Sequence, residues 1–269
     1  MNAICVTCGT QFANAAKPPP ECPICNEERQ YVGLDGQQWT TLEELRQGHE
    51  TKVADEEALL TSFSIEPHFG IGQRAFLIQT PKGNVLWDCI SLLDGSTIRH
   101  IKALGGLQGI AISHPHYYTT MVEWSRAFGN VPIYLHKEDE KWVMRPDSSI
   151  RFWEGDTCRV LDDLTLIHCG GHFAGSTVLY FPSGAGGKGV LLSGDTIQVV
   201  PDRRWVSFMY SYPNCIPLPA DSVQRIVRSV EPFTFDRIYA AFPKMTVATG
   251  GRDAVRRSAE RYMRAIGST

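Results

Sequence analysis

Short runs of apolar residues recur along the chain from about residue 62 to its end. Runs of about four to eight such residues, bounded by Gly, Pro, Asn or Asp, predict β-strands. We expect strands over residues 75–80, 85–90, 109–113, 131–136, 164–168, 178–181, 190–193 and 237–241. Segments whose apolar residues recur every three or four positions predict helices over residues 96–104, 119–128, 222–229 and 252–266.

The connections between these elements predict how the strands pair. The turn Pro81-Lys82-Gly83-Asn84 joins two strands closely, which predicts an antiparallel hairpin. The strand–helix–strand order over residues 109–136 predicts parallel pairing, because parallel neighbours need a long crossover. We therefore expect an α/β (α+β) fold with mixed sheets and helices outside them.

The first 60 residues differ from this pattern. Residues 1–30 contain half of the cysteines, and residues 31–60 contain one predicted helix, residues 41–47, followed by the acidic run Asp55-Glu56-Glu57. We predict three parts: a small module over 1–30, a connector over 31–60 that lies against the main domain, and the main domain over 61–269.

Composition and charge argue against some classes of function. The chain has 269 residues, 43% of them hydrophobic, with 26 Lys and Arg against 29 Asp and Glu. Residues 1–60 hold four basic and ten acidic residues, a net charge of −6, and the remainder has a net charge of +3. Neither part has the basic excess of a nucleic-acid-binding surface. No apolar run is long enough to span a membrane, and the first residues lack the order of a secretion signal. We expect a cytoplasmic protein that acts on a small molecule.

Four cysteines indicate a small metal module. Cys5 and Cys8 form one Cys-x2-Cys pair, Cys22 and Cys25 form another, and 13 residues separate the pairs. This is the spacing of a tetrahedral four-cysteine zinc site. A segment of about 30 residues cannot bury enough apolar surface to fold alone, so the ion would supply stability. The sequence predicts a structural Zn²⁺ in a zinc ribbon, with a rubredoxin-type iron site as the alternative. A ribbon of this kind could also be a contact in a homo-oligomer.

Histidines and an aspartate follow three of the predicted strands. His114 and His116 flank Pro115 after one strand, His172 lies in Gly-Gly-His-Phe-Ala-Gly-Ser after another, and Asp195 lies in Ser-Gly-Asp-Thr after a third. Imidazole groups are common ligands of first-row metals, and flanking glycines allow the backbone to approach closely. Three strands thus each deliver a candidate ligand at the same end.

From about residue 60 onward the chain resembles the metallo-β-lactamase superfamily. His114 and His116 match the start of its His-x-His-x-Asp-His motif, His172 its glycine-flanked histidine, and Asp195 its bridging acid. The resemblance covers about 210 residues and implies an αββα sandwich of two mixed sheets with helices outside. It also implies that Asp88, in Val-Leu-Trp-Asp-Cys, lies next to the metal ligands and orients them without binding the ion itself.

The chain departs from the family pattern at three positions. Tyr118 and Thr119 replace the Asp-His continuation, and Phe242 replaces the last histidine. In binuclear members of the superfamily these positions supply the second ion. We therefore expect a single ion held by His114, His116 and His172, with Asp195 either as a further ligand or as the group that holds the attacking water.

Such a site can carry several functions. A catalytic zinc ion lowers the pKa of water to about 7 and polarises a substrate oxygen. We expect a hydrolase acting on a small ester, thioester or related bond, with Asp195 and Tyr118 as catalytic residues. Two histidines and a carboxylate also suit Fe²⁺, so one alternative is a mononuclear iron redox enzyme acting on a thiol or persulfide. Another is a non-catalytic binding module that keeps the fold.

Overall fold

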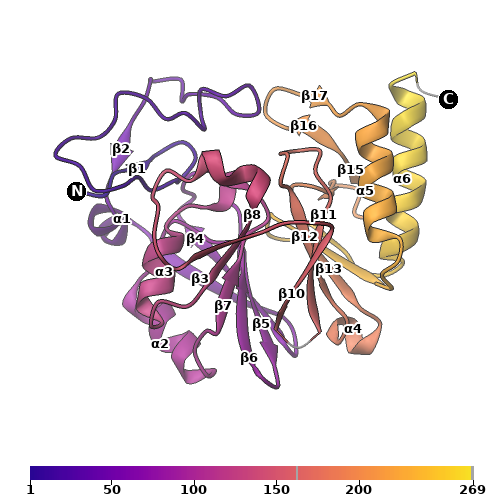
Figure 1. Ribbon diagram of the computed structural model, residues 1–269, viewed down its shortest axis with the longest axis horizontal. Coiled ribbons are helices and arrows are strands. Elements are labelled where there is room, and N and C mark those ends of the chain that lie inside the picture. Colours follow the sequence, from indigo (N-terminus) through magenta and orange to yellow (C-terminus); the bar gives the residue numbers. More distant parts are fainter. Residues whose placement is uncertain (162, 268–269) are drawn as a thin grey trace.

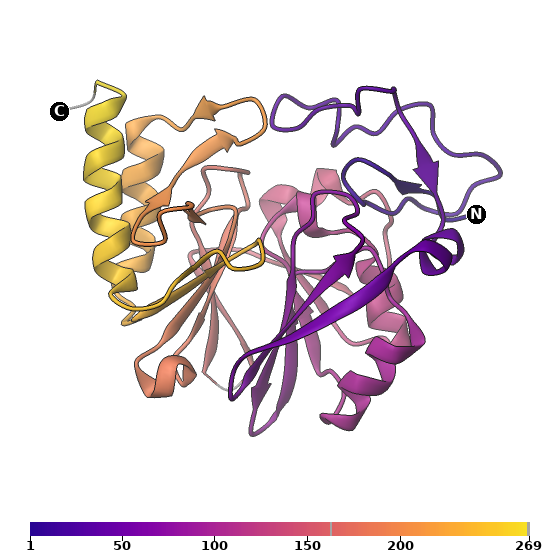
Figure 2. The same cartoon turned by 180° about the vertical axis from the view of Figure 1, so that it is seen from behind.

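The computed structural model describes residues 1–161 and 163–267, which form two mixed β-sheets with helices on the outside (Figures 1 and 2). The first sheet has seven strands in sequential order: β3 (Glu50–Glu57), β4 (Leu60–Glu66), β5 (Ala75–Thr80), β6 (Gly83–Trp87), β7 (Gly109–Ala111), β8 (Ile133–His136) and β9 (Ile150–Trp153). Strands β3 to β6 are antiparallel, and β6 to β9 are parallel.

The second sheet has six strands in the order β10 (Thr157–Leu161), β11 (Leu164–His168), β12 (Thr177–Phe181), β13 (Val190–Gly194), β18 (Arg237–Ala240) and β19 (Thr246–Val247). Only the β13–β18 pair is parallel. Two-stranded pairs lie beside the sheets: β1 (Ile4–Cys5) with β2 (Trp39–Thr40), β14 (Gln198–Val199) with β15 (Val206–Ser207), and β16 (Met209–Ser211) with β17 (Ile216–Pro217).

Helices cover the outer face of each sheet. α2 (Gly95–Ala103) and α3 (Met121–Ala127) lie on the first sheet, and α5 (Ala220–Val230) and α6 (Gly251–Ala265) lie on the second. The expected αββα sandwich is therefore confirmed, with each helix within two residues of the bounds that the sequence predicts. The remaining helical segments are short: α1 (Leu42–Gly48), α4 (Gly184–Gly187), η1 (Pro115–Tyr117) and η2 (Lys137–Trp142).

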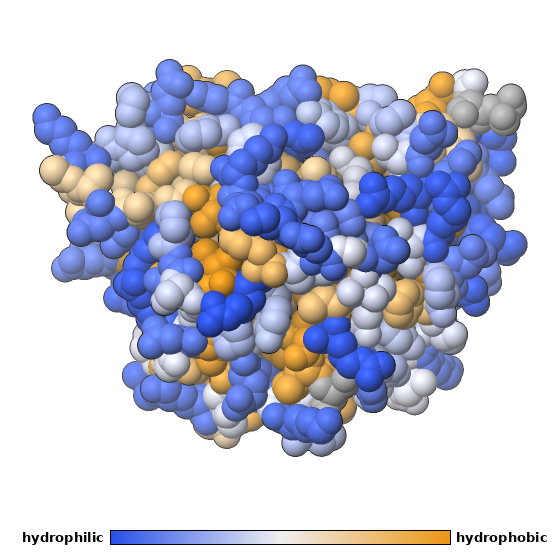
Figure 3. Space-filling model, in the orientation of Figure 1, coloured by the Kyte–Doolittle hydropathy of each residue, from blue (hydrophilic) through white to orange (hydrophobic). Residues whose placement is uncertain are grey.

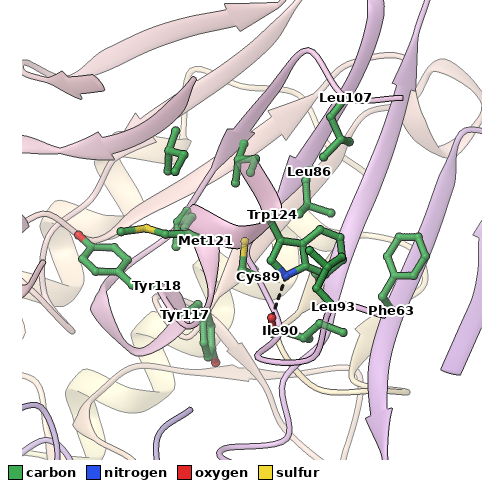
Figure 4. Close-up of a cluster of buried hydrophobic side chains, with 14 of the residues drawn as sticks. Phe63, Leu86, Cys89, Ile90, Leu93, Leu107, Tyr117, Tyr118, Met121 and Trp124 are labelled. Atoms are coloured by element: carbon green, nitrogen blue, oxygen red, sulfur yellow. Dashed lines mark hydrogen bonds between the residues drawn. The ribbon is translucent and has the colours of Figure 1, made fainter. Parts of the chain in front are cut away.

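Three layers of buried side chains hold the sandwich together. Phe76, Trp87 and Leu179 belong to the layer between the sheets. A second layer joins the first sheet to α2 and α3, where the Trp124 indole donates to the carbonyl of Ile90 (Figure 4). The third layer joins the second sheet to α5 and α6. The free energy gained by burying apolar groups is proportional to the area removed from water, so these three layers supply most of the stability of the fold.

A buried arginine also links the two sheets. Arg74, 1% exposed, pairs with Glu56 of β3 at 2.7 Å and donates to the carbonyl of Ala240 in β18. A buried guanidinium needs both a carboxylate and hydrogen-bond acceptors, and Arg74 has them. The β3 edge of the first sheet is thus tied to β18 of the second sheet.

Residues 31–60 are more than the connector that the sequence suggested. They contain β2, which pairs with the cysteine module, and most of the hairpin from β3 to β4. β3 carries mostly charged, exposed residues, so hydrophobic periodicity did not reveal it. Charged side chains are typical of edge strands, where they discourage pairing with other chains.

The surface is mainly hydrophilic on the face shown in Figure 3, with hydrophobic residues in small groups. Among the described residues, Leu34 is the most exposed large apolar side chain. None of the helices in residues 1–161 and 163–267 is long and apolar enough to cross a membrane.

Candidate metal centre

Four side chains from three turns converge at one end of the sandwich. His114 and His116 follow β7, His172 follows β11, and Asp195 follows β13. One ligand atom of each lies within 4.8 Å of those of the other three. All four side chains are buried, with exposed fractions of 0% to 4%. The structure therefore brings together all four residues that the sequence nominated for this site.

The backbone allows the turns to approach closely. Gly194 has a φ of +52°, and a Cβ atom there would lie 2.7 Å from Oγ of Ser113. Only glycine fits such a conformation and such a contact. The Asp195 turn can therefore pack directly against the turn that carries His114.

Hydrogen bonds orient the imidazole rings. Nδ1 of His114 lies 2.9 Å from Oγ of Ser113, and Nδ1 of His172 lies 3.1 Å from the carbonyl oxygen of Met209. A bond at Nδ1 fixes the ring and leaves Nε2 for a metal. The backbone N–H of Ser113 donates to Asp88 at 2.7 Å, so Asp88 lies behind the His114 turn, where the family resemblance puts it.

Distances and unpaired atoms show that these residues fit a cation. Nε2 of His172 lies 3.4 Å from Nδ1 of His116, and Nε2 of His114 lies 3.6 Å from Oδ2 of Asp195. Ligands about 2.0–2.1 Å from a tetrahedral ion would be about 3.4 Å apart. Nε2 of His114 and Oδ1 of Asp195 are buried and have no hydrogen-bond partner in the part of the chain that the structure describes. Unpaired buried polar atoms are costly, and a bound ion would satisfy them.

Burial also keeps the histidines in the protonation state that a ligand needs. It lowers the pKa of His114 and of His116 well below the usual value, and that of His172 to about 4. These imidazoles are neutral at pH 7 and can donate lone pairs. Burial raises the pKa of Asp195 to about 7 and that of Asp88 to about 8. A cation beside Asp195 would favour its ionised form.

The four cysteines form a second candidate centre. Sγ of Cys5 lies 3.6 Å from Sγ of Cys25, and Sγ of Cys8 lies 3.7 Å from Sγ of Cys22. A disulfide would bring two sulfurs to about 2.05 Å. Ligands about 2.3 Å from a tetrahedral zinc ion would be about 3.8 Å apart, close to both distances. All four thiols are buried, and their sulfur atoms form one cluster. The geometry fits a tetrahedral metal site.

Comparisons of sequence and of structure place the chain among known proteins, although no protein-family model matches the sequence. The uncharacterized protein YmaE of Bacillus subtilis (strain 168) is 51% identical over 267 residues, which cover 98% of this chain and 97% of YmaE. The chain belongs to the YmaE family. The match is long enough to include both the cysteine module and the two sheets.

Solved structures show the fold of this member of the YmaE family. The metallo-β-lactamase FIM-1 from Pseudomonas aeruginosa, in its mono-zinc form, matches with a TM-score of 0.59 and 13% identity, over 78% of this chain and 95% of FIM-1. A B3 metallo-β-lactamase with an active-site glutamic acid gives a TM-score of 0.55 and 16% identity, over 85% of this chain and 94% of that one. The resemblance seen in the sequence is thus confirmed: the chain has the metallo-β-lactamase fold.

Tyr118 does not lie where the sequence prediction requires. Tyr118 is buried in the layer beneath α3, beside Met121, and its ring points away from that of Tyr117 (Figure 4). In η1, a 3₁₀ segment with about three residues per turn, successive side chains point about 120° apart. Tyr117 therefore takes the place beside the ligands that we expected for Tyr118.

The Tyr117 ring lies 4.4 Å from that of His114, and the side chain is fully buried. Its hydroxyl forms no hydrogen bond of ordinary geometry, although it lies close enough to Asp195 for each group to shift the pKa of the other. The sequence contained one usable signal, an aromatic residue next to His116. Nothing in the sequence indicated which of the two adjacent tyrosines would lie beside the ligands.

The positions that would serve a second ion are used for packing. Phe242 packs against the hydrophobic layer beneath α3, and the carbonyl of Thr119 accepts the backbone N–H of Gln11 at 3.0 Å. Arg29 is a further residue that the sequence did not reveal. It reaches the His172 turn from the cysteine module, 143 residues away in the sequence.

Proposed function

We propose that this protein is a hydrolase with one divalent ion at His114, His116, His172 and Asp195, and that a structural zinc ion is held by the four cysteines. Its substrate would be a small molecule with an ester, thioester or related bond. The observation that carries the proposal is the convergence of four buried ligand atoms, two of them unpaired, at the ligand-bearing end of a metallo-β-lactamase fold. Tyr118, Thr119 and Phe242, which replace the ligands of a second ion, support a single catalytic ion.

A bound divalent ion would polarise a carbonyl or phosphoryl oxygen and make water more acidic. The protein's own groups prepare the site for this. The carbonyl of Met209 and the hydroxyl of Ser113 fix the rings of His172 and His114. The near-complete burial of the ligands lowers the local dielectric, which strengthens electrostatic interactions with developing charge.

Tyr117 is suited to a direct role. Burial and the Asp195 carboxylate raise the pKa of Tyr117 well above its usual value, so the phenol is a hydrogen-bond donor at neutral pH. Among the described residues its hydroxyl has no hydrogen-bond partner, and its ring contacts that of His114. We assign Tyr117, in place of Tyr118, as the donor to the oxyanion that forms when water attacks the substrate.

Metal analysis with an activity screen tests the proposal. We expect protein purified from its native cells to contain two zinc ions per chain and to hydrolyse members of a panel of small esters and thioesters. One zinc at the cysteines with one iron at the His/Asp site, as distinguished by the absorption of the iron, would overturn the hydrolase in favour of the iron redox enzyme. A single zinc retained by the cysteines, with no hydrolysis, would overturn it in favour of a binding module.

A further inference from the structure

The cysteine module contacts both halves of the sandwich around the His/Asp site. On the first-sheet side, the Gln11 N–H donates to Thr119, and the Ser91 hydroxyl donates to the carbonyl of Gly9 at 2.9 Å. Gly9 has a φ of +77°, and a Cβ atom there would lie 2.2 Å from Oγ of Ser91. Thr119 lies three residues after His116, so the module sits directly on the turn that carries two of the ligands.

On the second-sheet side, residues 27–30 contact the β16–β17 hairpin, whose tip meets a loop of the N-terminal segment (Figures 1 and 2). The Asn214 amide donates to the carbonyls of Glu28 and Gln30, both at 2.9 Å, and the Ser211 hydroxyl donates to the carbonyl of Arg29 at 3.0 Å. This segment directly follows Cys25. The second cysteine pair is therefore connected to the hairpin by only a few residues.

Arg29 lies at the centre of this contact. Its Nε donates to the carbonyl oxygen of His172 at 2.5 Å. Its guanidinium lies between two aromatic rings, 4.6 Å from the centroid of Phe173 and 4.0 Å from that of Tyr210, and pairs with Glu27. Planar guanidinium groups stack well on rings and keep fixed geometry.

We propose that Arg29 is a positioning residue for the His/Asp site: it anchors the cysteine module on the His172 turn, so that the metal of the cysteine site controls how firmly the other site holds its ion. This inference rests on the metal site of the proposed function but not on the proposed reaction. Without the cysteine-bound ion, residues 22–30 would lose their fold, and Arg29 would leave His172. With it, Arg29 stays in place and the His172 turn is fixed.

Release of metal to a chelator tests this coupling in the full chain. Both sites are loaded with Co²⁺, because thiolate-bound cobalt absorbs strongly in the near ultraviolet and cobalt bound to His and Asp does not. We expect Arg29→Ala to release the His/Asp ion at least about tenfold faster than wild type, as loss of a group supporting a metal ligand usually does. The cysteine-bound ion should leave at the wild-type rate, and Arg29→Lys should rescue only part of the effect.

Arg46→Ala is the matched control. Arg46 also donates through Nε to a backbone carbonyl, that of Leu93 at 2.7 Å, and also joins the N-terminal segment to the main domain, but away from the site. Equal release rates in Arg29→Ala and Arg46→Ala would overturn the proposal. As a second measurement, Cys22→Ser should accelerate release from the His/Asp site to the same extent as Arg29→Ala, and an unchanged rate would count against it. Because the readout is metal release, the coupling can be found even if no hydrolase activity is.

Discussion

The ring of Tyr117 lies 4.4 Å from that of His114, while the adjacent Tyr118, buried in the same hydrophobic layer, lies beside Met121 and points away from Tyr117 (Figure 4). The two tyrosines therefore provide a matched pair of substitutions. We expect Tyr117→Phe to lower kcat by about 10²-fold with both metal equivalents retained, as loss of an oxyanion donor does. Tyr118→Phe should leave kcat within about twofold. Steady-state kinetics with metal analysis checks both, and the opposite ranking would restore the role first expected for Tyr118.

Replacing two of the candidate ligands should remove one metal ion. We expect His114→Ala with His172→Ala to lose one equivalent while the cysteine-bound ion remains, because the two clusters share no ligand. Metal content per chain, measured after dialysis, checks this. Substituting His49 and His100 to alanine, both outside the clusters, gives the control. An unchanged metal content in the double ligand variant would contradict the assigned site.

Loss of the cysteine-bound ion should affect the module first. We expect Cys5→Ser with Cys22→Ser to expose residues 1–30 to proteases, because this segment has little apolar surface of its own to bury. The two sheets and their three hydrophobic layers should keep a cooperative thermal transition. Limited proteolysis and thermal melts distinguish the two parts. A protein without any cooperative transition would show that the module is integral to the core.

Asp139 should give the protein a measurable pH dependence of stability. Burial raises the pKa of Asp139 to about 7, and its carboxylate accepts the Gly175 N–H at 2.9 Å. In the unfolded chain its pKa is about 3.9. Between these values the folded state holds a proton that the unfolded state has lost, so stability falls as the pH rises from about 4 to 7.

Asp139→Asn keeps a hydrogen-bond acceptor and cannot ionise. Relative to this variant, the wild type should lose on the order of 4 kcal/mol of unfolding free energy across that range, at about 1.4 kcal/mol per pH unit. Urea unfolding at pH 4 and pH 8 measures the difference. Parallel stability curves would show that Asp139 is ionised in the folded protein throughout.

Local patterns in the sequence were enough to predict much of the fold and the candidate ligands. Helices such as α5 and α6 keep an apolar face, and His114, His172 and Asp195 each follow an apolar strand. β3 escaped prediction because an exposed edge strand has no apolar face to detect. The choice between Tyr117 and Tyr118 depended on a 3₁₀ turn, in which one residue changes the direction of a side chain by about 120°.

Contacts between distant parts of the chain could not be predicted in this way. Arg29 meets His172, and Arg74 meets Ala240, across separations of 143 and 166 residues. Neither arginine belongs to a motif, and each would be taken for a surface residue from its neighbours in the sequence. Their roles follow only from the way the module and the two sheets pack together.

The placement of the cysteine module also has an electrostatic consequence. Residues 1–48, with three basic and six acidic side chains, lie at the end of the sandwich where Arg29 and Gln11 reach the ligand-bearing turns. The negative potential of this segment would slow the encounter with anions and speed it for neutral or cationic molecules. Association rates of charged compounds should then depend on ionic strength, and added salt should reduce the discrimination between them.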